Sequence, residues 1–282
     1  MQNLTVINAD TDQRGAQKEN VFIALDRNGQ PLGSLFIYPF FDADLEPEHP
    51  HNLYLHLHTE RTKDAGEPVK DVLLEHALRR AVEIKHQAQQ KKTRVYACFL
   101  KHQQDKIAYF LQRGFTHDEG MYILDRHESA EMPHVKAPKE ITIQSWKMET
   151  EAEQHQFIET HRKIFSRHPY TTASLQKLMA LPGWNNFTAW SHTEIAGNIM
   201  VFIKRDNNNA IGYIEDLFVQ KHWRKRGIAK YLLYTALTHF QNIGLHHVQL
   251  EMWSANKPAS QLYRLFGFSP IDETEIAVGR YV

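Results

Sequence analysis

A short basic turn, placed between an expected strand and an expected helix, holds residues that could bind an anion. It reads Arg224-Lys225-Arg226-Gly227-Ile228-Ala229, and an amphipathic pattern follows it directly. The first N–H groups of a helix have no partner within the helix, and the helix dipole is positive at this end, so anions bind there. Gly227 permits unusual φ values and close backbone approach, and the arginines add charge. The turn is therefore a candidate pyrophosphate site, although a solvated basic turn would look the same.

Residues capable of proton transfer flank this turn in the sequence. Glu215 and Asp216 stand near the end of the preceding strand, and Tyr263 follows in a short helix. A carboxylate can accept a proton, and a phenol can donate one. Because neighbouring strand residues point to opposite faces, only one of Glu215 and Asp216 is expected to face a substrate. The plainer alternatives are a structural ion pair for the carboxylates and ring packing for Tyr263.

The elements that would position these residues form one pattern in the second half of the chain. Apolar alternation and helical periodicity predict a strand, two helices and a hairpin, followed by strand, helix, strand, helix and strand. The mixture predicts an α/β (α+β) fold. The expected ranges are 141–145, 149–165, 172–181, 187–191, 197–204, 211–219, 228–240, 247–253, 258–266 and 275–281.

The first half repeats a shorter version of this pattern. Two helices of the second half have no room in it, and residues 126–138 are polar, aperiodic and contain two prolines, which is typical of a linker. The predicted division is a first domain at 1–128, a linker at 129–138 and a second domain at 139–282. Expected strands are 4–8, 21–25, 32–38, 53–58, 94–99 and 121–125, with helices at 69–85 and 106–112.

The second half resembles the GNAT superfamily of acetyl-CoA-dependent N-acetyltransferases. It has the family's Arg-x-x-Gly-x-Ala turn at 224–229, followed by Asn256, Tyr263 and Gly267-Phe268. The resemblance implies a mixed, mostly antiparallel twisted sheet flanked by helices, in which two parallel strands splay apart around acetyl-CoA. The cofactor-binding residues that it implies are Leu217, Phe218, Val219, Arg224, Lys225, Arg226, Gly227, Ile228, Ala229, Asn256, Ser260 and Tyr263.

The resemblance also suggests how the cofactor arm is held. The backbone N–H groups of Phe218 and Val219 are expected to face the cofactor, one of them near the thioester carbonyl. Asn256 would either contact the arm or cap the short helix, since Asn is a good N-cap residue.

Catalytic roles follow from the same resemblance. Tyr263 is expected to be the general acid, and Glu215 the base and amine anchor, with Asp216 as the second candidate for that role. The acceptor side would be built from the helices after residue 145 and the loop between them, with His168, Tyr170, Trp184 and Trp190 as candidates.

The first half differs from the second at the anion-binding and acid positions. An alignment of the halves puts Ala65, Glu67 and Pro68 in the turn, and Gln103 and Phe110 where the second half has Asn and Tyr. Proline has no N–H to offer and its φ is fixed, and a glutamate would repel a pyrophosphate. The first half is therefore predicted to be a degenerate GNAT-like copy without a cofactor, with an unrelated α/β domain as the alternative.

Composition narrows the classes of partner and compartment. The chain has 33 basic and 33 acidic residues, so no global charge attracts nucleic acid or a membrane surface. No bilayer-length apolar run or signal peptide is evident, and the single Cys98 excludes an intramolecular disulfide, so a cytoplasmic protein is expected. His49, His51, His56 and His58 invite a metal hypothesis, but partners at diagnostic spacing are missing and no metal is expected.

The sequence thus predicts an N-acetyltransferase that moves an acetyl group from acetyl-CoA to a primary amine of a small molecule or peptide, in a ternary complex. The alternatives are a tandem synthase that acylates a thiol-sugar or peptide-precursor amine, and a non-catalytic acetyl-CoA-binding sensor. The acceptor's identity and the oligomeric state, monomer or homodimer, are left open.

Overall fold

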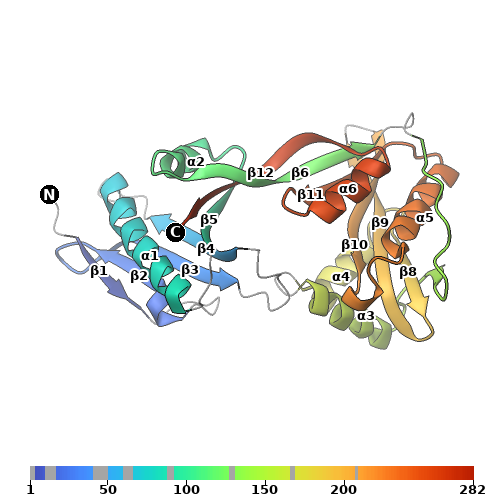
Figure 1. The fold of residues 1–282 in the computed structure, drawn as a ribbon, viewed down its shortest axis with the longest axis horizontal. Coiled ribbons are helices and arrows are strands. Elements are labelled where there is room, and N and C mark those ends of the chain that lie inside the picture. Colours follow the sequence, from blue (N-terminus) through green and yellow to red (C-terminus); the bar gives the residue numbers. More distant parts are fainter. Residues whose placement is uncertain are drawn as a thin grey trace. The chain divides into compact units, whose positions relative to one another are not determined.

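A computed structural model of the chain describes residues 4–9, 17–40, 50–59, 66–87, 92–126, 131–165, 169–206 and 209–282. They form two compact units (Figure 1). The first comprises Met1–Gly120 with Glu275–Val282, and the second comprises Met121–Thr274. No described helix is long and apolar enough to cross a membrane.

The first unit is a twisted sheet with two α-helices, α1 (Glu67–Gln87) and α2 (Gln104–Leu111). Its strands follow the order β1-β2-β3-β4-β5-β12-β6, in which the β4–β5 pair is parallel and the pairs from β1 to β4 are antiparallel. The strands are β1 (Thr5–Asn8), β2 (Val21–Leu25), β3 (Pro31–Phe40), β4 (His51–Thr59), β5 (Thr93–Leu100), and parts of β6 (Thr116–Arg126) and β12 (Ser269–Tyr281).

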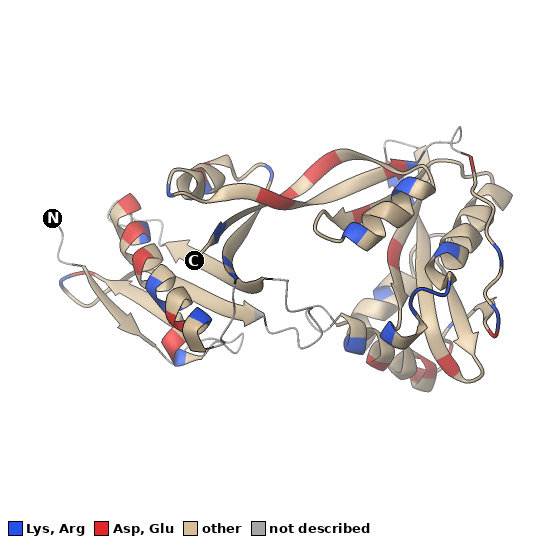
Figure 2. Cartoon of the chain, viewed as in Figure 1, with Lys and Arg blue, Asp and Glu red and all other residues tan. Residues whose placement is uncertain are grey.

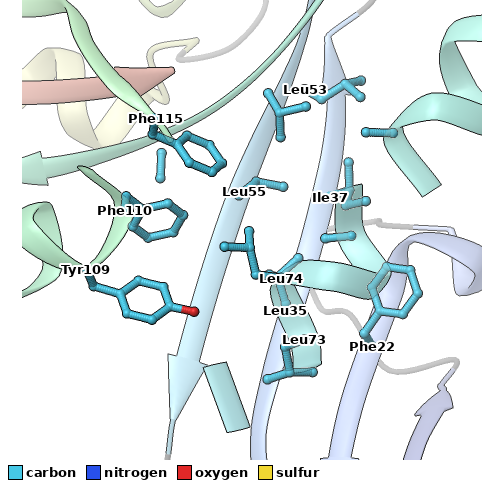
Figure 3. Packing of buried hydrophobic residues seen from close by; sticks show 14 of the residues in the cluster. Phe22, Leu35, Ile37, Leu53, Leu55, Leu73, Leu74, Tyr109, Phe110 and Phe115 are labelled. Atoms are coloured by element: carbon cyan, nitrogen blue, oxygen red, sulfur yellow. The ribbon is translucent and has the colours of Figure 1, made fainter. Parts of the chain in front are cut away.

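Alternation along the strands of the first unit explains its core. Leu35, Ile37, Leu53 and Leu55 point to one face and are buried, whereas the residues between them are only half-buried. The apolar side of α1 packs on that face, with Leu73 among the residues in contact (Figure 3). The remaining labelled residues of this core in Figure 3 are Phe22, Leu74, Tyr109, Phe110 and Phe115.

The second unit is a sheet covered by helices on both faces, with strand order β6-β11-β10-β9-β8-β7. The β10–β11 pair is parallel, and the other pairs are antiparallel. Helix α5 (Ile228–Asn242) packs on one face, and α3 (Glu151–Ile164) and α4 (Thr172–Met179) pack on the other (Figure 1). The remaining elements are β7 (Thr142–Ser145), β8 (Asn185–Ser191), β9 (Glu194–Asp206), β10 (Asn209–Val219), β11 (Val248–Trp253) and α6 (Lys257–Leu265).

Local sequence signals fix where the helices of the second unit begin. Thr150 and Glu153 form a capping box at the start of α3, and Thr171 and Ser174 form a similar reciprocal pair at α4. At α6 the Asn256 side chain accepts a hydrogen bond from the N–H of Ala259, and a proline lies in the first turn. These caps satisfy N–H groups that would otherwise have no partner in the helix.

The predicted fold class is confirmed, since both units have mixed sheets flanked by helices and each contains a parallel pair. The compact units, however, do not follow the boundaries expected at 128 and 139. Strands β6 and β12 each belong to both units: β11 pairs with the later part of β6, and the end of β12 pairs with β5. Apolar alternation identifies a strand but not its partner, so the sequence does not predict that β6 and β12 are shared between the units.

Candidate functional site

The parallel strands β10 and β11 separate partway along their length. Their pairing runs from Gly212–Val248 to Ile214–Leu250 and stops there. Beyond that point β10 remains paired with β9 as far as Val219, and β11 with β6 as far as Trp253. Each strand is therefore held on its outer side while the inner edges diverge, which is the splayed pair that the resemblance implies.

A β-bulge at Glu215 changes the orientation of the residues around the fork. The β9–β10 register passes from Ile214–Val201 to Asp216–Met200, which leaves Glu215 as an extra residue. The expectation that Glu215 and Asp216 face opposite sides of the sheet is wrong. Both carboxyls lie near Tyr170. Burial raises the pKa of the Tyr170 hydroxyl most, and the charges of Asp216 and Glu215 raise it further. Glu215 also accepts a hydrogen bond from that hydroxyl. Alternation along a strand predicts opposite faces only where the ladder is regular.

The carboxyls at the fork have different surroundings. Glu215 is solvent-accessible, and its pKa is raised by loss of surrounding water and then by the charges of Asp216 and Glu251. Asp216 is largely buried, and its Oδ2 lies 3.2 Å from Nε2 of His161 on α3. A cavity of about 430 Å³ between α3 and the segment 169–172 is lined in part by Tyr170.

The backbone of β10 beyond the bulge presents alternate amides to the open edge. The N–H of Gln220 donates to the Ala196 carbonyl of β9. Because hydrogen-bonded positions alternate in an antiparallel ladder, the N–H of Phe218 also points to β9, whereas those of Leu217 and Val219 point away from it. Of the two amides expected to face the cofactor, only that of Val219 points to the open edge. The side chain of Phe218 is buried against α3.

The basic turn leads from β10 into the first turn of α5. Gly227 is the N-cap residue with φ of 82°, and no side chain caps the helix. Ile228 and Ala229 are its first two residues, so their N–H groups have no partner within the helix. The turn contains lysine and arginine residues, which are coloured blue in Figure 2. The local structure is that of an open anion-binding helix end.

Two of the basic side chains in the turn also make structural contacts. Arg224 donates from Nε to the Val219 carbonyl at 3.1 Å, and the Arg226 guanidinium lies 4.7 Å from the ring centre of Trp223. Lys225, between them, has φ of 62°, so two residues of the turn are in the left-handed region. These contacts shape the turn while leaving the helix end accessible.

Replacing Gly227 should separate the conformational role of the glycine from its electrostatic setting. A Cβ there would meet nothing within 4 Å, so the cost of Gly227→Ala comes from the positive φ and is expected to be about 1–2 kcal/mol of unfolding free energy. Gly227→Asn, which tolerates this φ better, should cost less. Thermal unfolding measures both, and equal losses for Ala and Asn would contradict the assignment.

Helix α6 carries the remaining predicted residues. Asn256 caps this helix, which is one of the two roles left open by the sequence, and the Ser260 N–H donates to its carbonyl. Tyr263 is 8% exposed and its ring packs edge-on against Phe268. Burial and then the charge of Asp216 raise the pKa of Tyr263, so its phenol keeps its proton over the working pH range.

The structure places the acceptor-side candidates in different surroundings and adds one that the sequence did not suggest. Trp184 and Trp190 pack in the apolar cluster beneath α3 and α4, and His168 lies outside the described residues. Tyr170 does lie beside the carboxyls. His161 was missed, although its spacing four residues after the buried Phe157 puts it on the core-facing side of α3.

The corresponding region of the first unit is occupied by its own side chains. Arg113 pairs with Glu67 at 3.1 Å and with Asp71, in the first turns of α1, and its guanidinium lies 3.7 Å from the Tyr109 ring centre. Pro68 is the second residue of that helix, while Ala65 lies outside the described residues. An acidic helix start that already holds an arginine is poorly suited to a pyrophosphate.

Metal-binding geometry is not found in the part of the chain that the structure describes. No group of three or more His, Cys, Asp or Glu residues there is placed to hold a metal ion. His51, His56 and His58 lie on β4, and His49 is outside the described residues. The Cys98 thiol is half-buried, and its loss of water raises its pKa to about 12.

Known proteins resemble this chain in sequence and in fold. The family model described as "Acetyltransferase (GNAT) family" matches residues 146–268, and no curated protein sequence matches the chain significantly. A GCN5-related N-acetyltransferase from Anabaena variabilis ATCC 29413 is 11% identical with a TM-score of 0.54, over 99% of this chain and 72% of its own. At that identity it shows similarity of fold alone.

Two other solved structures span nearly all of this chain. One is a GCN5-related N-acetyltransferase from Sphaerobacter thermophilus, 15% identical, with a TM-score of 0.48 over 99% of this chain and 95% of its own. The other is a tandem GNAT protein from the clavulanic acid biosynthesis pathway, 12% identical, with a TM-score of 0.45 over 99% and 98%. Residues 146–268 match the GNAT acetyltransferase family in sequence, and the splayed strands and the open turn at Gly227 agree with that match.

Proposed function

We propose that the second unit transfers an acetyl group from acetyl-CoA to a primary amine of a small molecule or peptide, by direct attack in a ternary complex. The observation that carries this proposal is the fork between β10 and β11, which opens toward the uncapped start of α5. The fork offers backbone N–H groups to an extended arm, and the helix start offers N–H groups and a positive dipole to a pyrophosphate. The residues present therefore fit the cofactor.

The side chains around the fork suit the proton transfers of the reaction. An ammonium acceptor must lose a proton before it attacks, and Glu215 is accessible and has a raised pKa, as a general base requires. The departing thiolate must gain a proton, and Tyr263 retains its own. Asp216 lies nearby and its ionised form would favour a cationic acceptor, but its burial makes it the less suitable base.

The proposal is tested by two measurements on the full chain. Calorimetry with acetyl-CoA tests the donor, and a broad panel of primary amines, assayed by release of the CoA thiol, tests the acceptor. We expect tight binding and turnover above the rate of hydrolysis with at least one amine. Binding without any turnover would instead indicate a non-catalytic sensor, and no binding would reject acetyl-CoA as donor.

The two units make a prediction about stoichiometry. The first unit has Glu67 and Pro68 at its helix start, with Arg113 already paired there, so it should not bind the pyrophosphate. We expect one acetyl-CoA per chain by calorimetry. Two equivalents would show that the first unit is not degenerate.

The chain's surroundings follow from the same proposal. A near-neutral chain that acts on a free amine needs neither nucleic acid nor a membrane, so we propose a cytoplasmic enzyme with a small-molecule or peptide partner.

A further inference from the structure

A buried histidine lies behind the two carboxylates and has no part in the proposed proton transfers. The His161 side chain is 5% exposed, and its Nε2 lies 3.2 Å from Oδ2 of Asp216. That oxygen has no hydrogen-bond partner among the described residues, so the contact has the distance of an ion pair without the alignment of a hydrogen bond. At this distance a protonated His161 would act on Asp216 through its charge.

The surroundings of His161 are otherwise aromatic. Ring centres lie at 4.4 Å for Tyr170, 4.7 Å for Phe165, 5.9 Å for Phe157 and 6.0 Å for Phe218. The Nδ1 atom is buried and has no hydrogen-bond partner in the described part of the chain. Buried polar atoms without partners are uncommon because they cost free energy. A phenylalanine would fill this space without that cost, so the imidazole calls for a reason other than packing.

Asp216 occupies a central position in the electrostatics of the fork. Its charge raises the pKa of Glu215, of Tyr170 and of Tyr263, in each case after the effect of burial. Neighbouring carboxyls that interact share their protons, so without a counter-charge the pair would titrate jointly and one member would stay protonated to higher pH. A positive charge next to Asp216, and farther from Glu215, would favour the ionised form of Asp216 over that of Glu215.

We propose that His161 is a positioning residue whose positive charge neutralises Asp216, so that Glu215 is left as the carboxylate that exchanges the acceptor's proton. The inference rests on the proposed function and deepens it. The ammonium gives one proton to a Glu215 oxygen, and the freed amine attacks the thioester carbonyl to form the C–N bond. As the C–S bond breaks, Tyr263 protonates the departing thiolate and regains a proton that the nitrogen loses, while Glu215 releases its own proton to water. His161 transfers no proton itself. Among the described residues, the titratable groups on which Asp216 acts are Glu215, Tyr170 and Tyr263, and Glu251 acts in turn on Glu215.

The test uses carboxyl titration by ¹³C NMR on the full chain, in the parent and in His161→Phe and His161→Gln. Phe keeps the ring without the charge, and Gln keeps an N–H donor without the charge. Signals are assigned by their loss in Asp216→Asn and Glu215→Gln. In both His161 variants we expect the Asp216–Glu215 pair to take up its first proton about one pH unit or more higher than in the parent.

A double variant separates this charge effect from a structural one. In an Asp216→Asn background the buried imidazole has no anion to stabilise its proton and should be neutral, so His161→Phe should leave the Glu215 titration unchanged. A merely structural histidine would perturb both backgrounds alike. In the enzyme assay, the acidic limb of kcat/KM for the amine should move to higher pH in the single variants and stay in place in the double variant.

The inference is overturned if folded His161→Phe or His161→Gln titrates as the parent does, or if the shift persists with Asp216→Asn. Thermal unfolding and acetyl-CoA binding establish that each variant is folded, and either His161 variant alone suffices. The NMR readout needs no substrate. Absence of turnover with every amine would therefore count against the proposed function, and an unshifted carboxyl titration against the role of His161.

Discussion

Tyr263→Phe should lower turnover by about two orders of magnitude or more while acetyl-CoA still binds, because removing a general acid typically costs 10²–10⁴ in rate. The phenol is buried with its ring against Phe268, and a phenylalanine preserves that packing. Its raised pKa keeps it protonated, which a donor to a departing thiolate requires. The change therefore removes the hydroxyl with its proton and keeps the packing of the ring. Steady-state kinetics with acetyl-CoA calorimetry measure both parts of the expectation.

A matched tyrosine controls for loss of a phenol as such. Tyr234 on α5 packs against the same apolar cluster and lies away from the proposed chemistry, so Tyr234→Phe should leave turnover within a factor of about two. Equal activity of Tyr263→Phe and the parent would remove Tyr263 from the acid role. A fall in activity that is matched by lost cofactor binding would make it a binding residue instead.

Much of the second unit could be predicted because its signals are local. The basic turn, the positive-φ glycine and the Asn-Lys-Pro start of α6 each depend on a few adjacent residues. In the structure α5 begins at Ile228 and α6 at Lys257. Helical and alternating periods also gave the remaining elements of this unit, although β12 begins at Ser269, six residues before the expected start. Local backbone preferences and caps act over the same short distances that a sequence displays.

What the sequence did not reveal depends on pairing across the sheet. The bulge at Glu215 arises because β9 and β10 differ by one residue between their paired segments, and it turns both carboxyls to the α3 side. The exchange of β6 and β12 between the units is likewise a matter of partner choice. His161 lies beside Asp216 because α3 packs over β10. None of these depends on a local preference of the residues concerned.

Glu215→Gln should lower kcat/KM for the amine by about 10² or more and remove the acidic limb of its pH profile, because Gln cannot take the ammonium proton. The pKa of Glu215 is raised, chiefly by its loss of water and then by Asp216 and Glu251, so the parent's limb should lie above the usual glutamate range. Below that pKa the carboxyl is protonated and inactive as a base. Activity is measured across pH at saturating acetyl-CoA.

Two measurements distinguish a catalytic role of Glu215 from a structural one: the unfolding midpoint of Glu215→Gln and the pH profile of Glu251→Gln. A carboxyl whose pKa is higher in the folded than in the unfolded state favours folding at low pH and loses that contribution as pH rises through the folded value. Glu215→Gln should therefore not destabilise the protein at neutral pH, and unfolding midpoints check this. Glu251→Gln is the matched control: it keeps the base, lowers the pKa of Glu215, and should move the acidic limb to lower pH without abolishing turnover. Retention of an unchanged limb in Glu215→Gln would assign the proton transfer to another group, with Asp216 the nearest candidate.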